Sequence, residues 1–285
     1  MIHEFFQSWD LFANTYLAGW MIALLLAMGG VTVVARDQIF IGAAVAQSST
    51  FGIALAMVAG GWIGGGINEH HLAPVMAVLF AIGAAVLTAR TGRIGRESHE
   101  AVTGWVFLAA SAGAILLVAH APHGLDEVQR LLASSIIGAS GADVIVFTAL
   151  TVFTAVAIAL SHRTLRLLVM DEQTAAVLGV RVQLWNLAMA VWLGLALGLS
   201  LRTSGMLFTF GCLILPALTA KSVCRRVAPM FVVAPIVSLG AGVMAFVLAN
   251  HYDLPPAQTD VVLLSVCVLF AWGLRRIRFA AREAT

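Results

Sequence analysis

Charged residues are what this sequence most conspicuously lacks. They make up 11% of its 285 residues, against about 25% in soluble domains, whereas hydrophobic residues make up 61%. Short charged clusters alternate along the whole chain with apolar runs of roughly 18–22 residues, the length at which a helix spans a bilayer. The pattern excludes a soluble globular domain. These runs are apolar on all sides, which also argues against the alternating strands of a membrane β-barrel.

Cysteine and the sequence signatures of enzymes are also scarce. The chain has three cysteines, Cys212, Cys224 and Cys267, without a CxxC pair, so neither a disulfide framework nor a zinc ribbon is indicated. It has no GxxxxGK[ST], no HExxH and no basic run interleaved with aromatic residues. We therefore expect no catalysis, no cofactor and no nucleic-acid binding in this chain. Met206 and Cys212 are soft donors that do not share a helical face, and we interpret them as packing residues.

Nine hydrophobic segments follow one another along the chain. They predict an all-α, polytopic membrane protein of about eight to nine transmembrane helices that form a single domain over residues 1–285. The seventh segment is short and contains Pro216, which predicts a break there. The nine segments cover residues 13–34, 39–60, 72–89, 101–119, 143–161, 182–201, 204–220, 230–249 and 259–273.

The basic residues predict how the segments cross the membrane. The connections between successive segments lie alternately on the two sides of the membrane. Only two of the 16 Lys and Arg residues, Arg130 and Arg202, fall on one side, and the others fall on the opposite side or at the C-terminal end. Because Lys and Arg favour the cytoplasmic side, we expect a multi-pass protein of the cell membrane, with its N-terminus outside and its C-terminus in the cytoplasm.

The connection over residues 161–182 predicts a short helix at the cytoplasmic surface. Asp171 stands where an N-cap would stand, and Gly179 is a natural stop about two turns later. Ala175, Ala176 and Leu178 would form a small apolar knob that suits a groove on another protein. The alternative interpretation is a surface helix without a special function.

Asp171, Ala175 and Gly179 have the spacing of the D-x-x-x-A-x-x-x-G signature, and here the chain resembles the permeases of metal-ion ABC importers. Further matches follow in collinear order at residues 30–36, 136–140, 205–220 and 253–257. The resemblance implies a fold like that of the vitamin B12 permease, a homodimer, and a coupling helix at about 171–179 that enters a cleft on a separate, ATP-binding ATPase subunit. It also implies a transition-metal cargo, zinc or manganese, delivered by an extracytoplasmic binding protein.

The chain departs from this family where its ion path is expected. The family typically has G-D-x-(L/I)-S-H, and here Ala43 and Gln47 replace its Asp and His. Gln47 and Ser48 still begin an unusually polar run, so we place a translocation path at Ala43, Gln47 and Ser48. The same polar groups could instead bond between helices, and the cargo could differ. A membrane-embedded enzyme or scaffold is a third interpretation. His251 and Asp253 are placed at the outer mouth, where capping of a turn is the alternative role.

Overall fold

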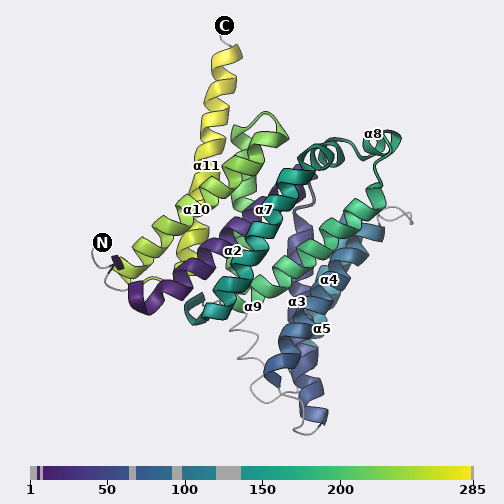
Figure 1. Ribbon diagram of the computed structural model, residues 1–285, viewed down its shortest axis with the longest axis vertical. Helices are drawn as coiled ribbons and strands as arrows, with labels where there is room; N and C mark the ends of the chain where they lie inside the picture. Colours follow the sequence, from purple (N-terminus) through teal and green to yellow (C-terminus); the bar gives the residue numbers. More distant parts are fainter. Residues whose placement is uncertain (1–4, 7–8, 64–68, 92–97, 120–135, 284–285) are drawn as a thin grey trace. The chain divides into compact units, whose positions relative to one another are not determined.

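The secondary structure of the chain is helical. The computed structural model describes residues 5–6, 9–63, 69–91, 98–119 and 136–283, and these contain no strand, which confirms the all-α prediction. The elements follow in chain order (Figure 1): α2 (Trp9–Ala35), α3 (Phe40–Ile63), α4 (Glu69–Thr91), α5 (His99–Val118), the 3-10 turn η1 (Ile136–Gly138), α7 (Gly141–Met170), α8 (Glu172–Val177), α9 (Val182–Val223), α10 (Val227–Tyr252) and α11 (Pro256–Glu283).

Eight helices of the described chain are long and apolar enough to cross a membrane. The sixth and seventh predicted segments fall together in α9, whose 42 residues would measure about 63 Å as one straight helix, about twice the hydrocarbon thickness. Gly205 interrupts α9 with φ 75° and ψ 175°, a conformation that only glycine adopts readily. The predicted break at Pro216 is wrong. The fixed φ of proline suits a helix and its ring removes only one hydrogen bond, whereas a positive φ ends the helical path.

The chain folds into two compact units. The first comprises Met1–Asp37, Ser135–Ala175 and Leu207–Thr285, and the second comprises Gln38–Ser134 and Ala176–Met206. Both units are therefore assembled from stretches that are distant in the sequence. Gly205 lies beside one crossing between them. Asp37, which has φ 57°, lies at another, so both of these crossings coincide with left-handed backbone.

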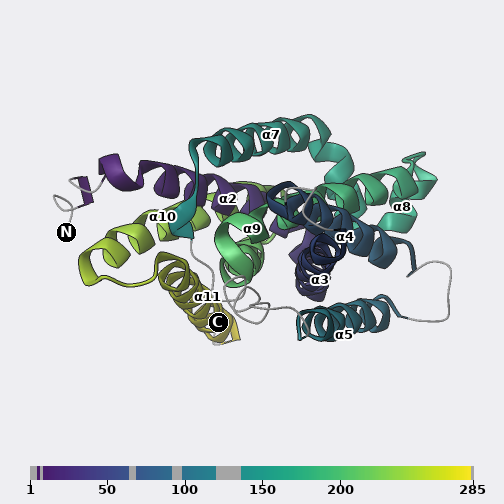
Figure 2. The same cartoon turned by 90° about the horizontal axis from the view of Figure 1, so that it is seen from below.

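In the first unit, α2 lies between α7 and α10, and α11 packs on α10 (Figure 2). Glycine allows the backbones to approach closely, since a Cβ added at Gly30 would overlap the carbonyl oxygen of Leu213 in α9. A hydroxyl bonds across the same bundle, where Ser238 Oγ donates to Ala23 O at 3.0 Å. Small residues and interhelical hydrogen bonds are the contacts that hold helices together where the surrounding lipid is as apolar as the side chains.

In the second unit, α3 packs against both α4 and α5. A Cβ added at Gly52 of α3 would lie 2.5 Å from the carbonyl oxygen of Met76 in α4. The part of α9 before Gly205 meets α4 in the same way, because a Cβ at Gly194 would lie 2.5 Å from Ile82 Cα. Each unit thus has glycine at close helix crossings.

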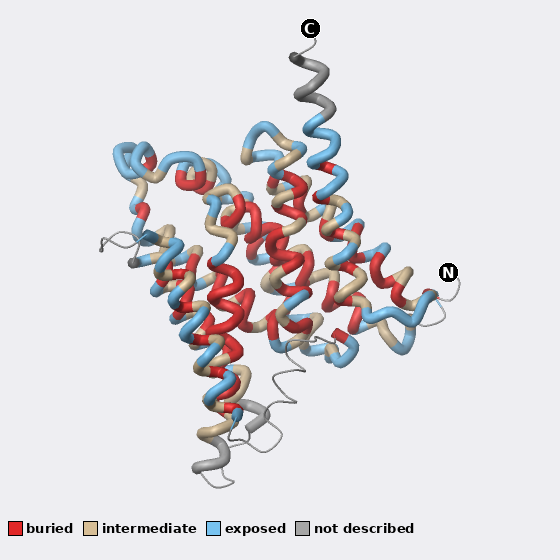
Figure 3. Tube along the Cα trace, turned by 180° about the vertical axis from the view of Figure 1, so that it is seen from behind, coloured by how far each residue is buried: buried red, intermediate tan, exposed pale blue. Residues whose placement is uncertain are grey.

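Buried residues (Figure 3) make up most of the spans of α2 and α3 but only a minority of those of α4, α5, α7, α10 and α11. The remaining faces are apolar as well as exposed, as Phe153 and Leu160 in α7 illustrate. A helix that is hydrophobic all round, but buried on only one side, is typical of a membrane span. The exposed apolar faces are therefore suited to lipid or to another hydrophobic helix.

Candidate functional site

The connection after α7 forms a tightly capped turn of helix. Asp171 ends α7 and begins α8, because its backbone N–H donates to Leu167 O and its carboxylate caps the next turn. Gln173 N donates to Oδ1 at 2.8 Å, and Thr174 Oγ1 donates to Oδ2 at 2.5 Å. The Thr174 hydroxyl first, and then the backbone amides of Thr174 and Gln173, lower the pKa of Asp171 below its ordinary value. Gly179 follows the turn with φ 84°.

The exposed surface of this turn differs from the predicted knob. Ala175 is fully buried within the chain, whereas Val177 is 87% and Leu178 is 63% exposed. Val177 points away from Ala175 because residues two positions apart lie on opposite sides of a helix, and Leu178 follows the last residue of α8. Of the three residues of the predicted knob, Ala176 and Leu178 are therefore exposed, whereas Ala175 packs against its own chain. The apolar surface that a partner could contact consists of Ala176, Val177 and Leu178.

An ion pair joins the first residue of α8 to the end of α2. Arg36 Nη2 lies 3.4 Å from Glu172 Oε1 and donates to Leu168 O at 3.3 Å. The side chain of Arg36 is 12% exposed and that of Glu172 is 34% exposed, so the pair is partly shielded from water. One guanidinium thus holds together the ends of α2 and α7 and the start of α8.

A second cation closes the same end of α2. Lys221, near the end of α9, donates to Val34 O at 3.0 Å and pairs with Asp37 Oδ1 at 2.6 Å. A cation at a helix C-terminus satisfies carbonyls that lack intrahelical partners and complements the helix dipole. In the first unit, α2, α7 and α9 therefore end close together, at the end where their basic residues gather.

The polar run on α3 is buried. Ala43, Gln47 and Ser48 are each less than 10% exposed, and Gln47 Nε2 contacts Met206 Sδ at 3.3 Å. Thr50 Oγ1 donates to Ala46 O at 3.2 Å, and Ser49 Oγ has no hydrogen-bond partner among the described residues. Gln47 thus has a side-chain contact within the second unit, and the run as a whole is only partly satisfied.

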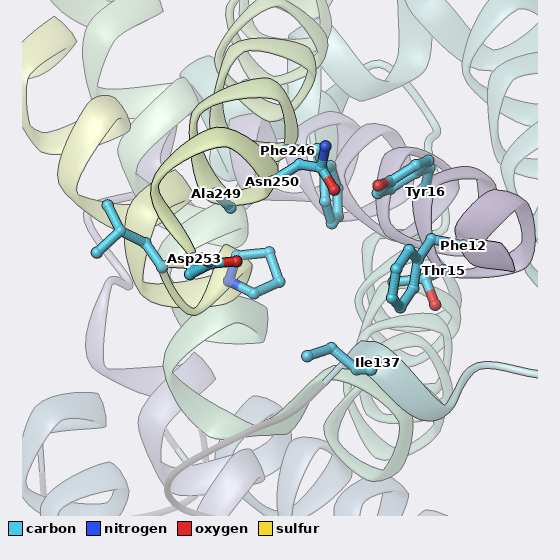
Figure 4. A pocket seen from close by; sticks show the side chains of 10 residues that line it. Phe12, Thr15, Tyr16, Ile137, Phe246, Ala249, Asn250 and Asp253 are labelled. Carbon is cyan, nitrogen blue, oxygen red and sulfur yellow. The ribbon is translucent and has the colours of Figure 1, made fainter. Parts of the chain in front are cut away.

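A pocket of about 250 Å³ opens at the other end of the first unit (Figure 4). Asn250 and Asp253 lie on one side of it and Phe12, Thr15 and Tyr16 lie on the other. Its further lining residues are Ile137, Phe246, Ala249, Leu254 and Pro256.

The two predicted outer-mouth residues lie differently with respect to this pocket. Asp253 lines it and caps α10 in the left-handed conformation, with its N–H donating to Ala249 O. His251 is not among the lining residues, and its ring packs on Tyr252 with centroids 4.7 Å apart. Capping of a turn, the alternative role considered from the sequence, is therefore what the backbone of Asp253 does.

Sequence reasoning missed one buried acid. Asp260 in α11 is 1% exposed, and Cys212 Sγ donates to its Oδ2 at 3.3 Å. An ionisable residue inside a predicted span is itself a signal of function, and that signal was available in the segment 259–273. Across the described stretches of the chain, no three His, Cys, Asp or Glu side chains come together as a ready-made metal site.

Span-length helices and glycine-based helix crossings define a polytopic membrane protein, in which a short capped helix follows α7. The sequence profile of the ABC 3 transport family matches residues 8–274, and the chain belongs to this family. This result confirms the family resemblance inferred from the motif that contains Asp171, Ala175 and Gly179.

Known proteins similar to this chain are consistent with the family. The chain is 24% identical over 264 residues to a "Probable metal transport system membrane protein" of Treponema pallidum, which covers 93% of this chain and 95% of that one. It is 21% identical to the manganese transport system membrane protein MntC of Halalkalibacterium halodurans, over 93% of this chain and 87% of that one. Among solved structures, a chain of PsaBC from Streptococcus pneumoniae in complex with Fab superposes with a TM-score of 0.79 at 17% identity, over 95% of each chain, and so shares the fold.

Proposed function

We propose that this chain is the permease subunit of an ATP-driven importer for a transition-metal ion, manganese or zinc. The family supports transport, and the names of the similar proteins, metal and manganese transport system membrane proteins, support the cargo. The permease is a single transmembrane domain that pairs with a second copy in the cell membrane. It carries out no chemistry itself, because a separate ATPase subunit binds and hydrolyses ATP.

The observation that carries this proposal is the capped turn over α8. Its ends are fixed by Asp171 and Gly179, and its exposed apolar residues are Ala176, Val177 and Leu178. A rigid, small, apolar projection between two membrane helices suits a cleft on an ATPase. In this arrangement Asp171 shapes the turn and Gly179 lets the chain leave it. Ala175 anchors the turn from the buried side.

Movement of the ATPase would reach the bundle through Glu172. The ion pair with Arg36 passes a displacement of α8 to the end of α2, which lies between α7 and α10 in the first unit. A surface turn connected to the bundle only through its own backbone could move without displacing α2. The basic end of the unit, with Arg36 and Lys221, faces the cytoplasm in this proposal, and the C-terminus lies on the same side.

The opposite end of the first unit would face the binding protein that delivers the ion. Asp253 and Asn250 supply polar groups to the pocket there, and His251 does not line it. The cargo path runs past Ala43, Gln47 and Ser48 on α3. A cargo other than manganese or zinc is the second candidate, because the amide of Gln47 contacts Met206 and supplies no anionic ligand.

The test is disruption of the contact with the ATPase. Val177→Glu combined with Leu178→Glu places two charges in the proposed apolar contact, where unpaired charges typically cost several kcal/mol. We expect loss of ATPase co-purification and of metal uptake, with normal membrane insertion. Leu11→Glu is the matched control, since Leu11 is 78% exposed at the opposite end of α2. Co-purification of the ATPase with the double variant at wild-type yield would exclude this turn as the docking site.

A further inference from the structure

We propose that Cys212 and Asp260 form a transit site for a thiophilic divalent cation, of the zinc class rather than the manganese class. The inference rests on the proposed transport function and adds to it the position and the chemistry of one binding step. It concerns two residues of the first unit that are 48 positions apart in the sequence and belong to neighbouring helices, α9 and α11.

Close helix packing brings the two side chains together. A Cβ added at Gly211 would lie 2.7 Å from Val261 Cγ2, so α9 and α11 are in close contact at the residues next to Cys212 and Asp260. The backbone of Leu213, the residue after Cys212 in α9, contacts Gly30 of α2. The pair is therefore enclosed on more than one side, which agrees with its burial: Cys212 is 0% and Asp260 is 1% exposed.

The carboxylate of Asp260 is only half satisfied. Its Oδ2 accepts the hydrogen bond from Cys212 Sγ, and its Oδ1 is buried without a hydrogen-bond partner among the described residues. A thiol is a weak donor, so the pair as it stands leaves a strong acceptor uncompensated in an apolar surrounding. A bound cation would satisfy both oxygens at once.

Pro216 adds a backbone acceptor at the same place. In an α-helix the N–H of residue 216 would bond to the carbonyl of residue 212, and proline has no N–H to offer. The carbonyl of Cys212 consequently lacks its usual intrahelical donor. Freed backbone carbonyls at membrane depth are tolerated where a neighbour, water or an ion satisfies them, and such carbonyls recur in ion sites of transporters.

The donor set defines the class of ion. A thiolate favours zinc, cadmium and cobalt over manganese, magnesium and calcium, and a carboxylate oxygen accepts any of them. Binding replaces the thiol proton by the metal, and this proton leaves to water, so no oxidant or reductant takes part. Two side-chain ligands leave coordination positions open, which suits an ion that must be released again. A purely structural Cys–Asp hydrogen bond between two helices is the competing explanation.

Cobalt binding to the purified full-length chain separates these explanations. Coordination by a thiolate gives a sulfur-to-cobalt charge-transfer absorption, which a structural hydrogen bond cannot produce. We expect one such site in the wild type and its loss in Cys212→Ser. Asp260→Asn should weaken binding by about tenfold or more, since even changes outside the first ligand shell cost about 10- to 100-fold. Zinc should displace the cobalt at concentrations at least about tenfold lower than manganese does.

The two other cysteines provide the controls. Cys224→Ser and Cys267→Ser remove thiols outside the proposed site, and the double variant leaves Cys212 as the only thiol of the chain. This double variant should keep the full charge-transfer band. Loss of the band in Cys212→Ser is then specific to that thiol and is not a general effect of replacing cysteine by serine. Absence of the band in the wild type, its loss in the double variant, or unchanged affinity in Asp260→Asn would overturn the proposal.

Transport separates failure of this site from failure of the proposed function. Vesicles that contain the chain, its ATPase and the binding protein should take up metal if the proposed function is right. Uptake without a cobalt band would refute the Cys212–Asp260 site alone. Absence of any ATP-dependent metal uptake would refute the proposed function, whatever the cobalt spectrum shows.

Discussion

Removing the charge of Glu172 should uncouple ATP hydrolysis from transport. Glu172→Gln keeps the size and the helix propensity of the side chain, and it removes the ion pair with Arg36, whose charged atoms are 3.4 Å apart. The hydrogen bond from Arg36 to Leu168 O does not involve Glu172 and can persist. The substitution therefore tests the link between α8 and α2 with little disturbance of the link between α7 and α2.

The expected magnitude follows from the geometry and the burial. Two unit charges at this distance attract by about 5 kcal/mol at an effective dielectric constant of about 20. Desolvation and side-chain ordering cancel most of this attraction, so a partly shielded pair should contribute about 1–2 kcal/mol net. A loss of that size corresponds to about a 5- to 30-fold change in an equilibrium between two conformations. We expect the number of ions transported per ATP to fall while the ATPase stays bound.

The assay compares transport with ATP hydrolysis in the same vesicles, for wild type, Glu172→Gln, Arg36→Gln and the double variant. These four proteins form a double-mutant cycle, and the coupling energy between Glu172 and Arg36 should be about 1–2 kcal/mol. Asp37→Asn is the control: it breaks an ion pair that is 40% and 80% exposed, and asparagine tolerates the left-handed backbone at this position. An unchanged transport ratio in Glu172→Gln, or an equal loss in Asp37→Asn, would refute the proposed transmission.

Three further outcomes are expected. Gly30→Ala should lower the free energy of unfolding by about 2–3 kcal/mol, and with it the melting temperature, because the added Cβ would overlap a backbone carbonyl. Gly240→Ala has open space around it and should be neutral or slightly stabilising. Equal melting temperatures of the two variants would contradict the packing at Gly30. Ala43→Asp with Gln47→His should increase metal retention by the solubilised complex, since both residues share one helix face, and unchanged retention would remove this face from the path. The pKa of Asp171 is lowered by its hydrogen bonds with Thr174 and Gln173, so its charge stabilises the turn above the pKa of an unfolded Asp, and this contribution is lost as the pH falls through the lowered value. The stability difference between wild type and Asp171→Asn should therefore shrink in acid, and a constant difference would contradict this role.

Hydropathy predicted the spans well because the length of an apolar run is set by the thickness of the bilayer. It also divided α9 close to the observed break, between the segments 182–201 and 204–220, but Pro216 was the residue singled out and Gly205 is the one with a positive φ. Proline is visible in a sequence as a helix breaker, but a lipid-embedded helix tolerates it. A glycine that serves as a hinge cannot be told from the many glycines that serve in packing.

The candidate sites were only partly predictable for a related reason. Local signals placed the caps of α8 correctly, since Asp171 and Gly179 act on residues two or three positions away. Contacts between distant segments were not accessible from one sequence. The burial of Ala175, the partner of Arg36 and the pairing of Cys212 with Asp260 all depend on which helices become neighbours.

The central claim is that this chain, with an ATPase partner, carries a transition-metal ion across a membrane. Its most direct test is ATP-dependent accumulation of radioactive manganese or zinc in vesicles that contain the chain, its ATPase and the binding protein. We expect uptake that requires ATP, stops in the Val177→Glu, Leu178→Glu variant and persists in Leu11→Glu. Uptake of neither metal by a fully assembled, ATP-hydrolysing complex would contradict it.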